Sequence, residues 1–234
     1  MKTSDAYQSF YTNYQTFKNY EVPTLKKKNI KQYDQEFWYP TASTSDMAVL
    51  EIGCGTGQFL HYLHYKGVTR IAGVDHDDAL KNFIHPVVRP NFIVADIFEY
   101  LGGLSPEEHF DRIVLFDVLE HFDRNEGRKL FLQLAQILER KGQIVLRVPN
   151  MASPWGAQHQ FGDLTHKEAY TPKSIRQLAL GSGLKCLDCY PQRRGSNSRR
   201  ILEGLLHTLL SKVLVEPPEI WSANFLAILE RSSD

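Results

Sequence analysis

A short apolar run, an acid and three glycines stand together in residues 49–57, VLEIGCGTG. A glycine turn after a strand is typical of nucleotide-like cofactor sites, because the missing Cβ lets the backbone approach the ligand. Dinucleotide sites have the spacing G-x-G-x-x-G, and the position of the third glycine is occupied here by Gln58. The acid just before the turn, Glu51, disfavours a pyrophosphate but suits an ammonium group. The turn therefore favours a cofactor that carries an amino acid over a dinucleotide.

Two further groups combine carboxylates with imidazoles and could move a proton. Asp163 and His166 lie in one stretch without periodicity, and Asp117, Glu120 and His121 follow an apolar run. A hydroxyl that accepts a transferred group must lose its proton, which requires a general base, a metal ion or both. The alternative for Asp163 and His166 is that they only tether their loop. A carboxylate-rich set with one imidazole could also hold magnesium or manganese.

The elements that must position these residues follow an α/β pattern. From residue 47 onward, short β-branched runs alternate with helical periodicity, which is typical of a parallel sheet flanked by helices. The predicted strands lie in residues 47–53, 70–77, 91–98, 110–122, 143–150, 184–192 and 222–231, the fourth together with its loop. The predicted helices are residues 57–67, 78–86, 127–142, 171–183 and 199–214. A loop as long as residues 151–170 is usually functional in a compact domain.

Five motifs, in this order, resemble those of class I S-adenosylmethionine-dependent methyltransferases. They are VLEIGCGTG, GVDHD at the second strand end, VADI at the third, LFDVLEHF at the fourth, and ERKGQIVLRVPN before and along the fifth strand. The resemblance covers residues 47 to about 185 well. It implies an enzyme with a Rossmann-like, seven-stranded, mostly parallel sheet with helices on both faces, and S-adenosylmethionine as its cofactor.

The resemblance also implies which residues hold the cofactor. Asp75 would accept hydrogen bonds from both ribose hydroxyls, because an ionised carboxylate offers two acceptor oxygens. Asp96 would accept from the adenine amino group, and Ile97 would cover the ring. The predicted cofactor residues are Glu51, Gly53, Cys54, Gly55, Gly57, Asp75, His76, Asp96, Ile97, Phe116 and Asp117.

Missing motifs narrow the atom that accepts the methyl group. The fourth strand is followed by FDVLEH rather than by the Asp/Asn-Pro-Pro-aromatic motif of nucleobase N-methyltransferases. Enzymes that methylate a cytosine carbon use the cysteine of a Pro-Cys pair as nucleophile, and the chain contains no such pair. Oxygen is therefore the expected acceptor. The stretch PN…GDLTHKEAYTPKSI resembles one in small bacterial methyltransferases of surface-polysaccharide and small-molecule synthesis. This implies a hydroxyl of a sugar, a glycan precursor or a nucleotide sugar.

The loop at about 150–171 is predicted to form the acceptor side. Its aromatic residues offer flat faces to a sugar ring, and arginines further on could meet a phosphate. The predicted substrate residues are Trp155, His159, Tyr170 and Arg193, the last beside Arg194. Lid packing is the alternative for Trp155 and Tyr170. The predicted catalytic residues are His166, preferred as the general base because its loop should cover the acceptor, His121 and Asp163.

Two other functions compete with the sugar O-methyltransferase. Asp117, Glu120 and His121 resemble the acid-x-x-Glu-His arrangement that binds a divalent ion in some quinone-biosynthesis O-methyltransferases, although the first acid here is Asp. This alternative implies a quinone-like or other small metabolite as the methyl acceptor, with or without help from a metal ion. Short motifs are poorly specific, so we expect no metal at these residues. A non-catalytic methyltransferase-like binding domain is the third candidate. The joint presence of Glu51, Gly55, Asp75 and Asp96 argues against it, because a chain without cofactor binding has no physical need to keep them together.

Composition and charge limit the partners. Lys plus Arg and Asp plus Glu number 27 each among 234 residues, so no net positive charge holds a nucleic acid by counterion release. No stretch has the length and apolarity of a signal peptide or a transmembrane helix. We therefore expect a cytoplasmic protein without stable membrane insertion, whose partner is a small molecule or a glycan.

The chain is expected to divide into a lid and a cofactor domain. Residues 1–45 are predicted to form a helical lid or extension, and residues 46–234 the methyltransferase domain with an inserted helix at about 199–214. The broad apolar stripe of this helix predicts packing on the domain or on a second subunit of a homodimer. The predicted lid contacts with the cofactor are Tyr11, Tyr14 and Trp38.

The cysteines do not form a disulfide framework or a four-ligand zinc site, since the chain has only three. Cys186 and Cys189 form a C-x-x-C pair within a predicted strand, where residues three apart point to opposite faces. We therefore expect buried structural thiols rather than a redox or metal pair.

Overall fold

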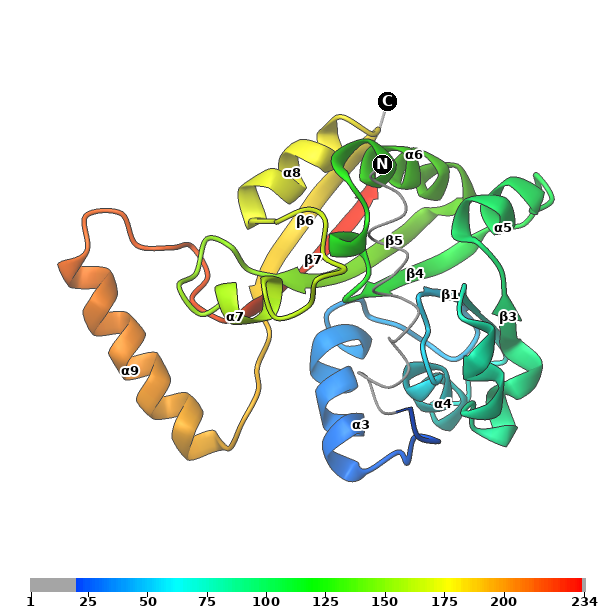
Figure 1. Ribbon diagram of the computed structural model, residues 1–234, viewed down its shortest axis with the longest axis horizontal. Coiled ribbons are helices and arrows are strands. Elements are labelled where there is room, and N and C mark those ends of the chain that lie inside the picture. The colour runs from blue at the N-terminus through cyan, green and yellow to red at the C-terminus, as the bar shows by residue number, and fades with distance from the viewer. Residues whose placement is uncertain (1–19, 233–234) are drawn as a thin grey trace.

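A computed structural model describes residues 20–232 as a single sheet with helices on both faces (Figure 1). The sheet has seven strands in the order β3-β2-β1-β4-β5-β7-β6. The strands are β1 (Ala48–Ile52), β2 (Arg70–Asp75), β3 (Phe92–Val94), β4 (Phe110–Phe116), β5 (Leu138–Pro149), β6 (Leu184–Pro191) and β7 (Asn224–Arg231). The pairs among β1 to β5 are parallel, and β7 runs antiparallel to both of its neighbours. The predicted Rossmann-like, mostly parallel sheet is confirmed.

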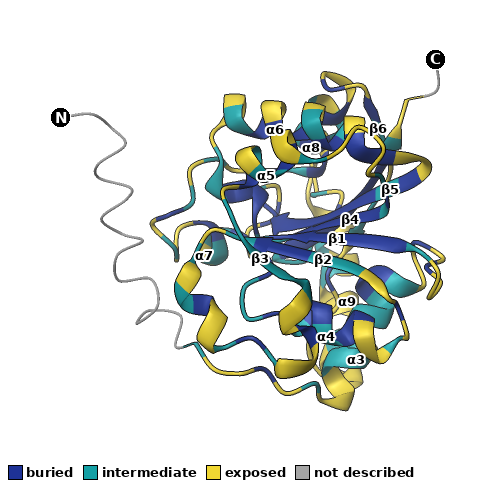
Figure 2. Ribbon diagram, turned by 90° about the vertical axis from the view of Figure 1, so that its right-hand side faces the viewer, coloured by how far each residue is buried: buried dark blue, intermediate teal, exposed yellow. Residues whose placement is uncertain are grey.

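Helices and turns form a layer above and a layer below the sheet (Figure 2). The elements are α3 (Lys27–Tyr33), η1 (Asp34–Trp38), α4 (Gln58–Tyr65), η2 (Asp78–Asn82), η3 (Pro86–Asn91), α5 (Ile97–Gly103), η4 (Leu119–His121), α6 (Arg124–Ile137), α7 (Ala157–Gln160), α8 (Pro172–Leu180) and α9 (Asn197–Val213). One core cluster joins the sheet to α5, α6 and α8, and a second joins the other face to α3, η1 and α4. All residues of β1 are buried, as expected for a central parallel strand covered on both faces.

Three predicted boundaries are wrong for local reasons. The predicted helix 78–86 is replaced by η2 and η3, because a residue before proline disfavours the helical conformation and His85 is extended at φ −58, ψ 131. The predicted strand 91–98 ends earlier, since Asp96 caps α5 through the amides of Phe98 and Glu99. The predicted helix 127–142 ends at Ile137, where β5 begins with a bulge against β4.

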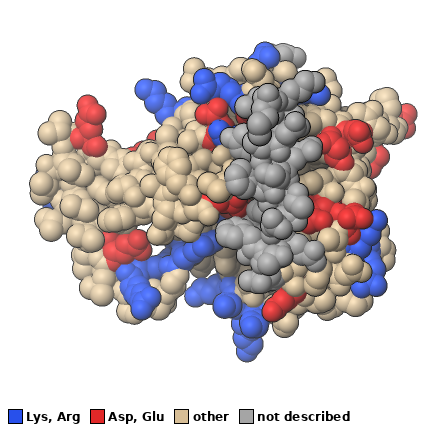
Figure 3. Space-filling view, in the orientation of Figure 1, with Lys and Arg blue, Asp and Glu red and all other residues tan. Residues whose placement is uncertain are grey.

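Helix α9 stands away from the body of the protein (Figure 1) and buries none of its residues. The predicted packing of this helix on its own domain is therefore wrong. Polar side chains of α9 contact two tryptophans: Ser211 accepts from Trp221 Nε1 at 2.9 Å, and His207 stacks on Trp221 and accepts from Trp155 Nε1 at 3.1 Å. The exposed apolar residues of α9 and the segment after it are Ile201, Leu202, Leu205, Leu206, Leu209, Val213, Leu214 and Val215. In Figure 3 this part of the surface is largely uncharged. Among the described residues, no helix combines the length and apolarity required to cross a membrane.

Strand β6 contains a bulge that overturns the prediction for the cysteines. Its register with β7 shifts between Cys186 and Asp188, so an extra residue enters the strand. The alternation of faces therefore changes, and the Sγ atoms of Cys186 and Cys189 lie 3.5 Å apart instead of on opposite faces. Both thiols are half-buried.

Candidate functional site

The glycine turn lies where the order of the parallel strands reverses. Strands β2 and β3 lie on one side of β1, and β4 and β5 lie on the other. Ligands of open α/β sheets bind outside the carboxyl ends of the strands at such a point. The turn after β1, the end of β2 and the segment after β4 therefore form the candidate cofactor site.

The glycines of this turn have a backbone conformation that other residues rarely adopt. Gly53, Gly55 and Gly57 have φ of +66°, +52° and +74°. A Cβ at Gly53 would clash with Val118, whereas the space beside Gly55 is open to 4 Å. The amide of Gly55 donates to Asp75 Oδ2 at 2.9 Å, which links the turn to the end of β2. The open side of Gly55 is where a ligand can approach the backbone.

Glu51 is a buried acid whose environment calls for a cation. It is 5% exposed, and its Oε2 has no hydrogen-bond partner among the described residues. Burial, and then the charge of Asp75, raise its pKa well above the ordinary range, although Arg147 and the amide of Leu60 act in the opposite direction. An uncompensated carboxylate oxygen in a buried site is costly unless a ligand pairs with it. The residues present therefore fit a cofactor with an ammonium group.

The remaining predicted cofactor residues take different positions. Asp75 Oδ1 also accepts from the amide of Asp77 at 3.1 Å, and His76 Nδ1 lies 3.5 Å from the same carboxylate. Asp96 is exposed and caps α5, whereas Ile97 packs into the core. Cys54 is buried, and burial raises the pKa of its thiol well above the ordinary range.

A buried arginine organises the segment after β4. Arg147 Nε donates to Asp117 Oδ1 at 2.9 Å and Nη2 donates to Asp117 Oδ2 at 2.5 Å. Its Nη1 donates to Glu36 Oε2 at 2.7 Å, and the Phe116 ring lies 4.6 Å from the guanidinium carbon. Asp117 is held in this network at φ +57°. Its carboxylate is thus engaged by Arg147, and it is not part of the group of Glu120, His121 and His166. The sequence offered Asp117, Glu120 and His121 only as an alternative to a site without metal.

Glu36 and Arg147 were missed by the sequence analysis. Glu36 is buried and also receives hydrogen bonds from Gln32 Nε2 and Gln192 Nε2, each at 2.9 Å, while Tyr190 donates to its backbone carbonyl at 2.6 Å. The available signal was the arginine within the apolar strand sequence QIVLRVP, because a charged residue inside a buried strand needs a partner. The partner itself was not visible in the sequence.

The N-terminal segment covers the start of α4. Tyr33 donates to Gln58 Oε1 at 3.1 Å, and its ring stacks on Phe116 with centroids 6.2 Å apart. Gln58, which replaces the third dinucleotide glycine, therefore anchors the lid. Trp38, the third predicted lid contact, packs against Tyr62 of α4, and Lys66 Nζ lies 4.3 Å from its ring. Tyr11 and Tyr14 lie outside the described residues.

Three side chains converge beside the segment after β4. Glu120, His121 and His166 each place one ligand atom so that all three lie within 4.8 Å of one another. His166 Nε2 is 4.0 Å from Glu120 Oε1, and the two imidazole centroids are 4.7 Å apart. The Glu120 side chain is 1% exposed and the His166 side chain 9%. The two histidines predicted as alternative bases are thus neighbours in one site.

Hydrogen bonds define which nitrogen of each histidine is basic. His166 Nδ1 lies 3.0 Å from the Gln160 carbonyl, which can only accept, so Nδ1 carries the proton. Thr165 donates its hydroxyl proton to Asp163 Oδ1 at 2.6 Å, and His121 Nδ1 therefore donates to Thr165 Oγ1 at 3.0 Å. In both neutral rings Nε2 is then the basic nitrogen. The Asp163 carboxylate acts on His121 through Thr165, and the Asp163 backbone carbonyl accepts from the His166 amide at 3.3 Å.

The loop that carries His166 is docked on η4. The amides of Lys167 and Glu168 donate to the Glu120 carbonyl at 2.8 and 3.2 Å. Gln160 Nε2 donates to the Glu168 carbonyl at 3.1 Å, and Asp163 accepts from the Thr165 amide at 3.0 Å. The tethering role considered for Asp163 is therefore present, and it positions His166 and His121.

The predicted substrate residues are not brought together. Tyr170 is 4% exposed and lies in the core against α6, so it offers no face to a sugar. Trp155 is exposed, but its Nε1 donates to His207 on α9 at 3.1 Å. Burial and then the charge of Arg194 lower the pKa of His159, and the charge of Asp117 acts in the opposite direction. Arg193 is exposed.

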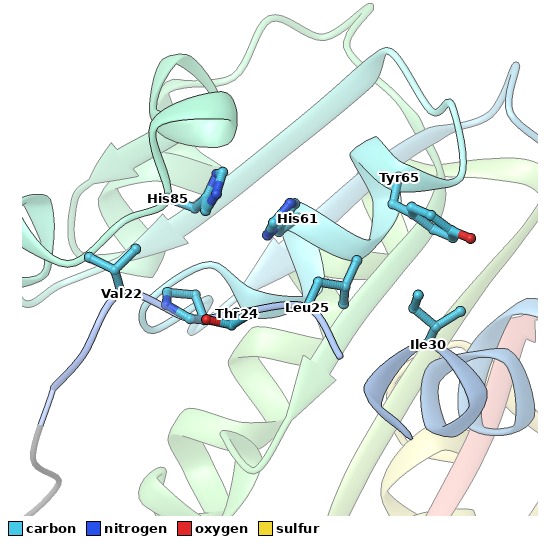
Figure 4. Close-up of a pocket in the computed structure, with 8 residues that line it drawn as sticks. Val22, Thr24, Leu25, Ile30, His61, Tyr65 and His85 are labelled. Carbon is cyan, nitrogen blue, oxygen red and sulfur yellow. The ribbon is translucent and has the colours of Figure 1, made fainter. Parts of the chain in front are cut away.

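A separate cavity of about 530 Å³ lies between the N-terminal segment and the outer side of α4 (Figure 4). His61 and His85 stack there with centroids 4.0 Å apart. The cavity is lined by Val22, Pro23, Thr24, Leu25, Ile30, His61, Tyr65 and His85. None of these residues belongs to the cofactor or acceptor groups.

A family model described as a methyltransferase domain matches residues 24–188. The chain belongs to this family. The match covers more than half of the chain and confirms the predicted class of enzyme, a methyltransferase with S-adenosylmethionine as its methyl donor. No curated protein matches the chain.

Solved structures share the fold of this methyltransferase. An S-adenosylmethionine-dependent methyltransferase from Archaeoglobus fulgidus is 20% identical with a TM-score of 0.66, covering 88% of this chain and 92% of its own. The PH0226 protein from Pyrococcus horikoshii OT3 is 14% identical with a TM-score of 0.62, and the match covers 94% of this chain and 99% of that protein. Magnesium protoporphyrin IX methyltransferase from Synechocystis PCC 6803, solved with bound SAH, is 14% identical with a TM-score of 0.59. The match covers 88% of this chain and 83% of that protein. At these identities the likeness establishes the fold of the methyltransferase.

Proposed function

We propose that this methyltransferase transfers the methyl group to a hydroxyl of a sugar, a glycan precursor or a nucleotide sugar. The observation that carries the proposal is the group of Glu120, His121 and His166, in which both imidazoles have Nδ1 protonated and Nε2 basic. A hydroxyl acceptor needs such a base, because its proton must leave as the new bond forms.

The cofactor would be held by residues of the turn and the strand ends. Glu51 would pair with the ammonium group, and Asp75 would accept from the ribose hydroxyls, since a carboxylate has lone pairs beyond the two already used by backbone amides. The open side of Gly55 would lie against the ligand, and Asp96 would reach the adenine amino group. When bound, S-adenosylmethionine supplies a methyl group already activated by the sulfonium.

The base proposed is His166. Its Nε2 would take the hydroxyl proton, and the nearby Glu120 carboxylate would stabilise the imidazolium that forms. The Gln160 carbonyl and the docked loop hold the ring in one orientation. His121 would line the same site as the second imidazole, with Asp163 and Thr165 positioning it.

The sugar class rests on the loop resemblance and on two arginines. Arg193 and Arg194 are exposed, and Arg194 acts on His159 of the acceptor loop. Arginines suit the phosphates of a nucleotide sugar. Tyr170 and Trp155 do not support the proposal, because one is in the core and the other binds α9.

Metal-assisted methylation of a quinone-like or other small metabolite is the second candidate. One carboxylate and two imidazoles within 4.8 Å form a set that a divalent ion can use. In that case the ion, and not an imidazole, would lower the pKa of the acceptor hydroxyl.

One assay separates the two candidates. The enzyme is treated with EDTA, desalted, and screened by mass spectrometry against nucleotide sugars, free glycans and phenols with S-adenosylmethionine. Methylated sugar with full activity after EDTA supports the proposed function. Activity on phenols alone, restored only by magnesium or manganese, would support the second candidate instead.

We also propose that α9 pairs with a second copy of the chain. Its polar side faces its own domain through His207 and Ser211, so the apolar side is left facing outward. Burial of apolar surface contributes about 25 cal/mol per Å², which makes a helix pair favourable. A homodimer would cover this side in both copies.

A further inference from the structure

We propose that Cys186 and Cys189 are a thiol-oxidation site that forms a reversible disulfide by exchange with a low-molecular-weight disulfide. This site is independent of the methyl-transfer reaction. It rests on the bulge in β6. Regular strand geometry would place these two residues on opposite faces, whereas the bulge makes them neighbours on one face.

The geometry brings the two sulfur atoms into contact. Their separation is 3.5 Å, and a disulfide requires about 2.05 Å, so the two sulfur atoms must approach by about 1.5 Å to bond. Among residues 20–232, strand β6 is the edge of the sheet and pairs with β7 alone, and Leu187 between the cysteines is exposed. A small disulfide can therefore reach the thiols at the bulge. Cys54, by contrast, is buried in the core.

The surroundings make one thiol the better nucleophile. The pKa of Cys186 is lowered, first by the hydrogen bond with Cys189 and, against the effect of burial, by the charge of Arg176. The pKa of Cys189 is raised by the same hydrogen bond and by burial. Arg176 is held on α8 by a two-point ion pair with Glu219 at 2.7 and 2.5 Å. Because the thiolate is the nucleophile, Cys186 attacks first.

The exchange balances without any further reactant. The Cys186 thiolate attacks one sulfur of the small disulfide, its S–S bond breaks, and one small thiolate leaves. Cys189 then loses its proton and attacks Cys186 Sγ, which releases the second small thiol and forms the Cys186–Cys189 bond. Two protein thiols are oxidised while one small disulfide is reduced to two thiols.

A metal site is the weaker interpretation of the same pair. Zinc in structural sites takes four ligands, and among residues 20–232 the metal-capable group found is Glu120, His121 and His166, which does not include these cysteines. Two thiols alone fit a disulfide better.

The test uses the full chain, reduced, desalted and then treated with oxidised glutathione. Cleavage after Lys185 and Arg193 yields one peptide with both cysteines, so an internal disulfide lowers its mass by two hydrogen atoms. We expect the titratable thiols of the denatured protein to fall from three to one and to return to three with dithiothreitol. A count that stays at three, or a peptide without the mass change, would overturn the proposal.

Single variants test the order of attack. Cys189→Ser should accumulate glutathione on Cys186, whereas Cys186→Ser should react much more slowly, and Cys54→Ser should form the internal disulfide as the wild type does. Equal trapping in the first two variants would refute the assignment of Cys186 as nucleophile. Loss of the disulfide in Cys54→Ser would place the reactive thiol elsewhere and overturn the site. Zinc release from the untreated protein, detected with a chromogenic chelator, would also count against it.

Discussion

Glu51→Gln tests whether the glycine turn recognises the amino-acid end of the cofactor. The substitution keeps the size of the side chain and removes its charge. A hydrogen bond to a charged group contributes about 1.5–3 kcal/mol. Because 1.4 kcal/mol corresponds to tenfold in affinity, binding of S-adenosylhomocysteine should weaken by about 10- to 150-fold.

The same substitution should not destabilise the protein without cofactor. Glu51 Oε2 is buried and has no hydrogen-bond partner among the described residues, and leaving a buried polar group unsatisfied costs about 1–3 kcal/mol. Removing the charge relieves the desolvation of the carboxylate, so the melting temperature of the ligand-free variant should equal or exceed that of the wild type. A residue that only supported the fold would behave in the opposite way.

The pH dependence follows from the direction of the shift. The pKa of Glu51 in the folded chain is raised above its ordinary value of 4.5, so folding favours the protonated form. The ligand-free wild type should therefore lose stability as the pH rises from about 4.5 through the raised pKa, and Glu51→Gln should not show this loss. An ammonium group binds the ionised form, so the affinity of the wild type should increase over the same pH range.

Titration calorimetry with two ligands measures this effect. S-adenosylhomocysteine carries the amino acid, and methylthioadenosine does not, so only the first should lose affinity in Glu51→Gln. Glu203→Gln, at an exposed position on α9, is the matched control and should change neither. Unchanged affinity for S-adenosylhomocysteine, or an equal loss for both ligands, would refute the pairing of Glu51 with the ammonium group.

Three further predictions concern the base, the buried ion pair and the assembly. His166→Ala should lower kcat, measured by single-turnover kinetics, by about 10²- to 10⁴-fold and leave the affinity for S-adenosylhomocysteine unchanged. His121→Ala should lower kcat by less. Full activity in both variants would exclude a histidine base. Glu36→Ala should lower the free energy of unfolding in urea by about 3–5 kcal/mol, because a buried arginine loses a partner; a change below 1 kcal/mol would show that this pair is not desolvated. Leu205→Lys with Leu209→Lys should convert a dimer into a monomer in light scattering, and a wild type that is monomeric at high concentration would disprove the α9 pairing.

The local part of the fold was accessible from the sequence. Glycines at 53, 55 and 57 have positive φ, as a tight turn between strand and helix requires, and β-branched runs became the parallel strands. Boundaries failed where a single side chain decided them. Asp96 ended a strand by capping a helix, and Pro86 ended a helix by restricting His85. These are short-range effects that compete with periodicity.

The acceptor site depended on tertiary structure. His121 and His166 were both recognised as candidates, but only the docking of the loop on η4 placed them 4.7 Å apart. Tyr170 had the residue type of a sugar platform, yet a parallel bridge to Asn150 turned it into the core. Residue type indicates what a side chain can do, whereas packing decides which surface it faces.

The sequence by itself determined the class of fold, the cofactor turn and the residue types available for proton transfer, because these depend on neighbours within a few positions. Only the tertiary structure decided the partners of the buried charges. Arg147 met Glu36 across 111 positions and also bound the Asp117 carboxylate. It likewise decided the cysteine pair, since one extra residue in β6 reversed the face on which Cys189 lies. Such contacts arise when distant elements pack, and no local pattern encodes their distance.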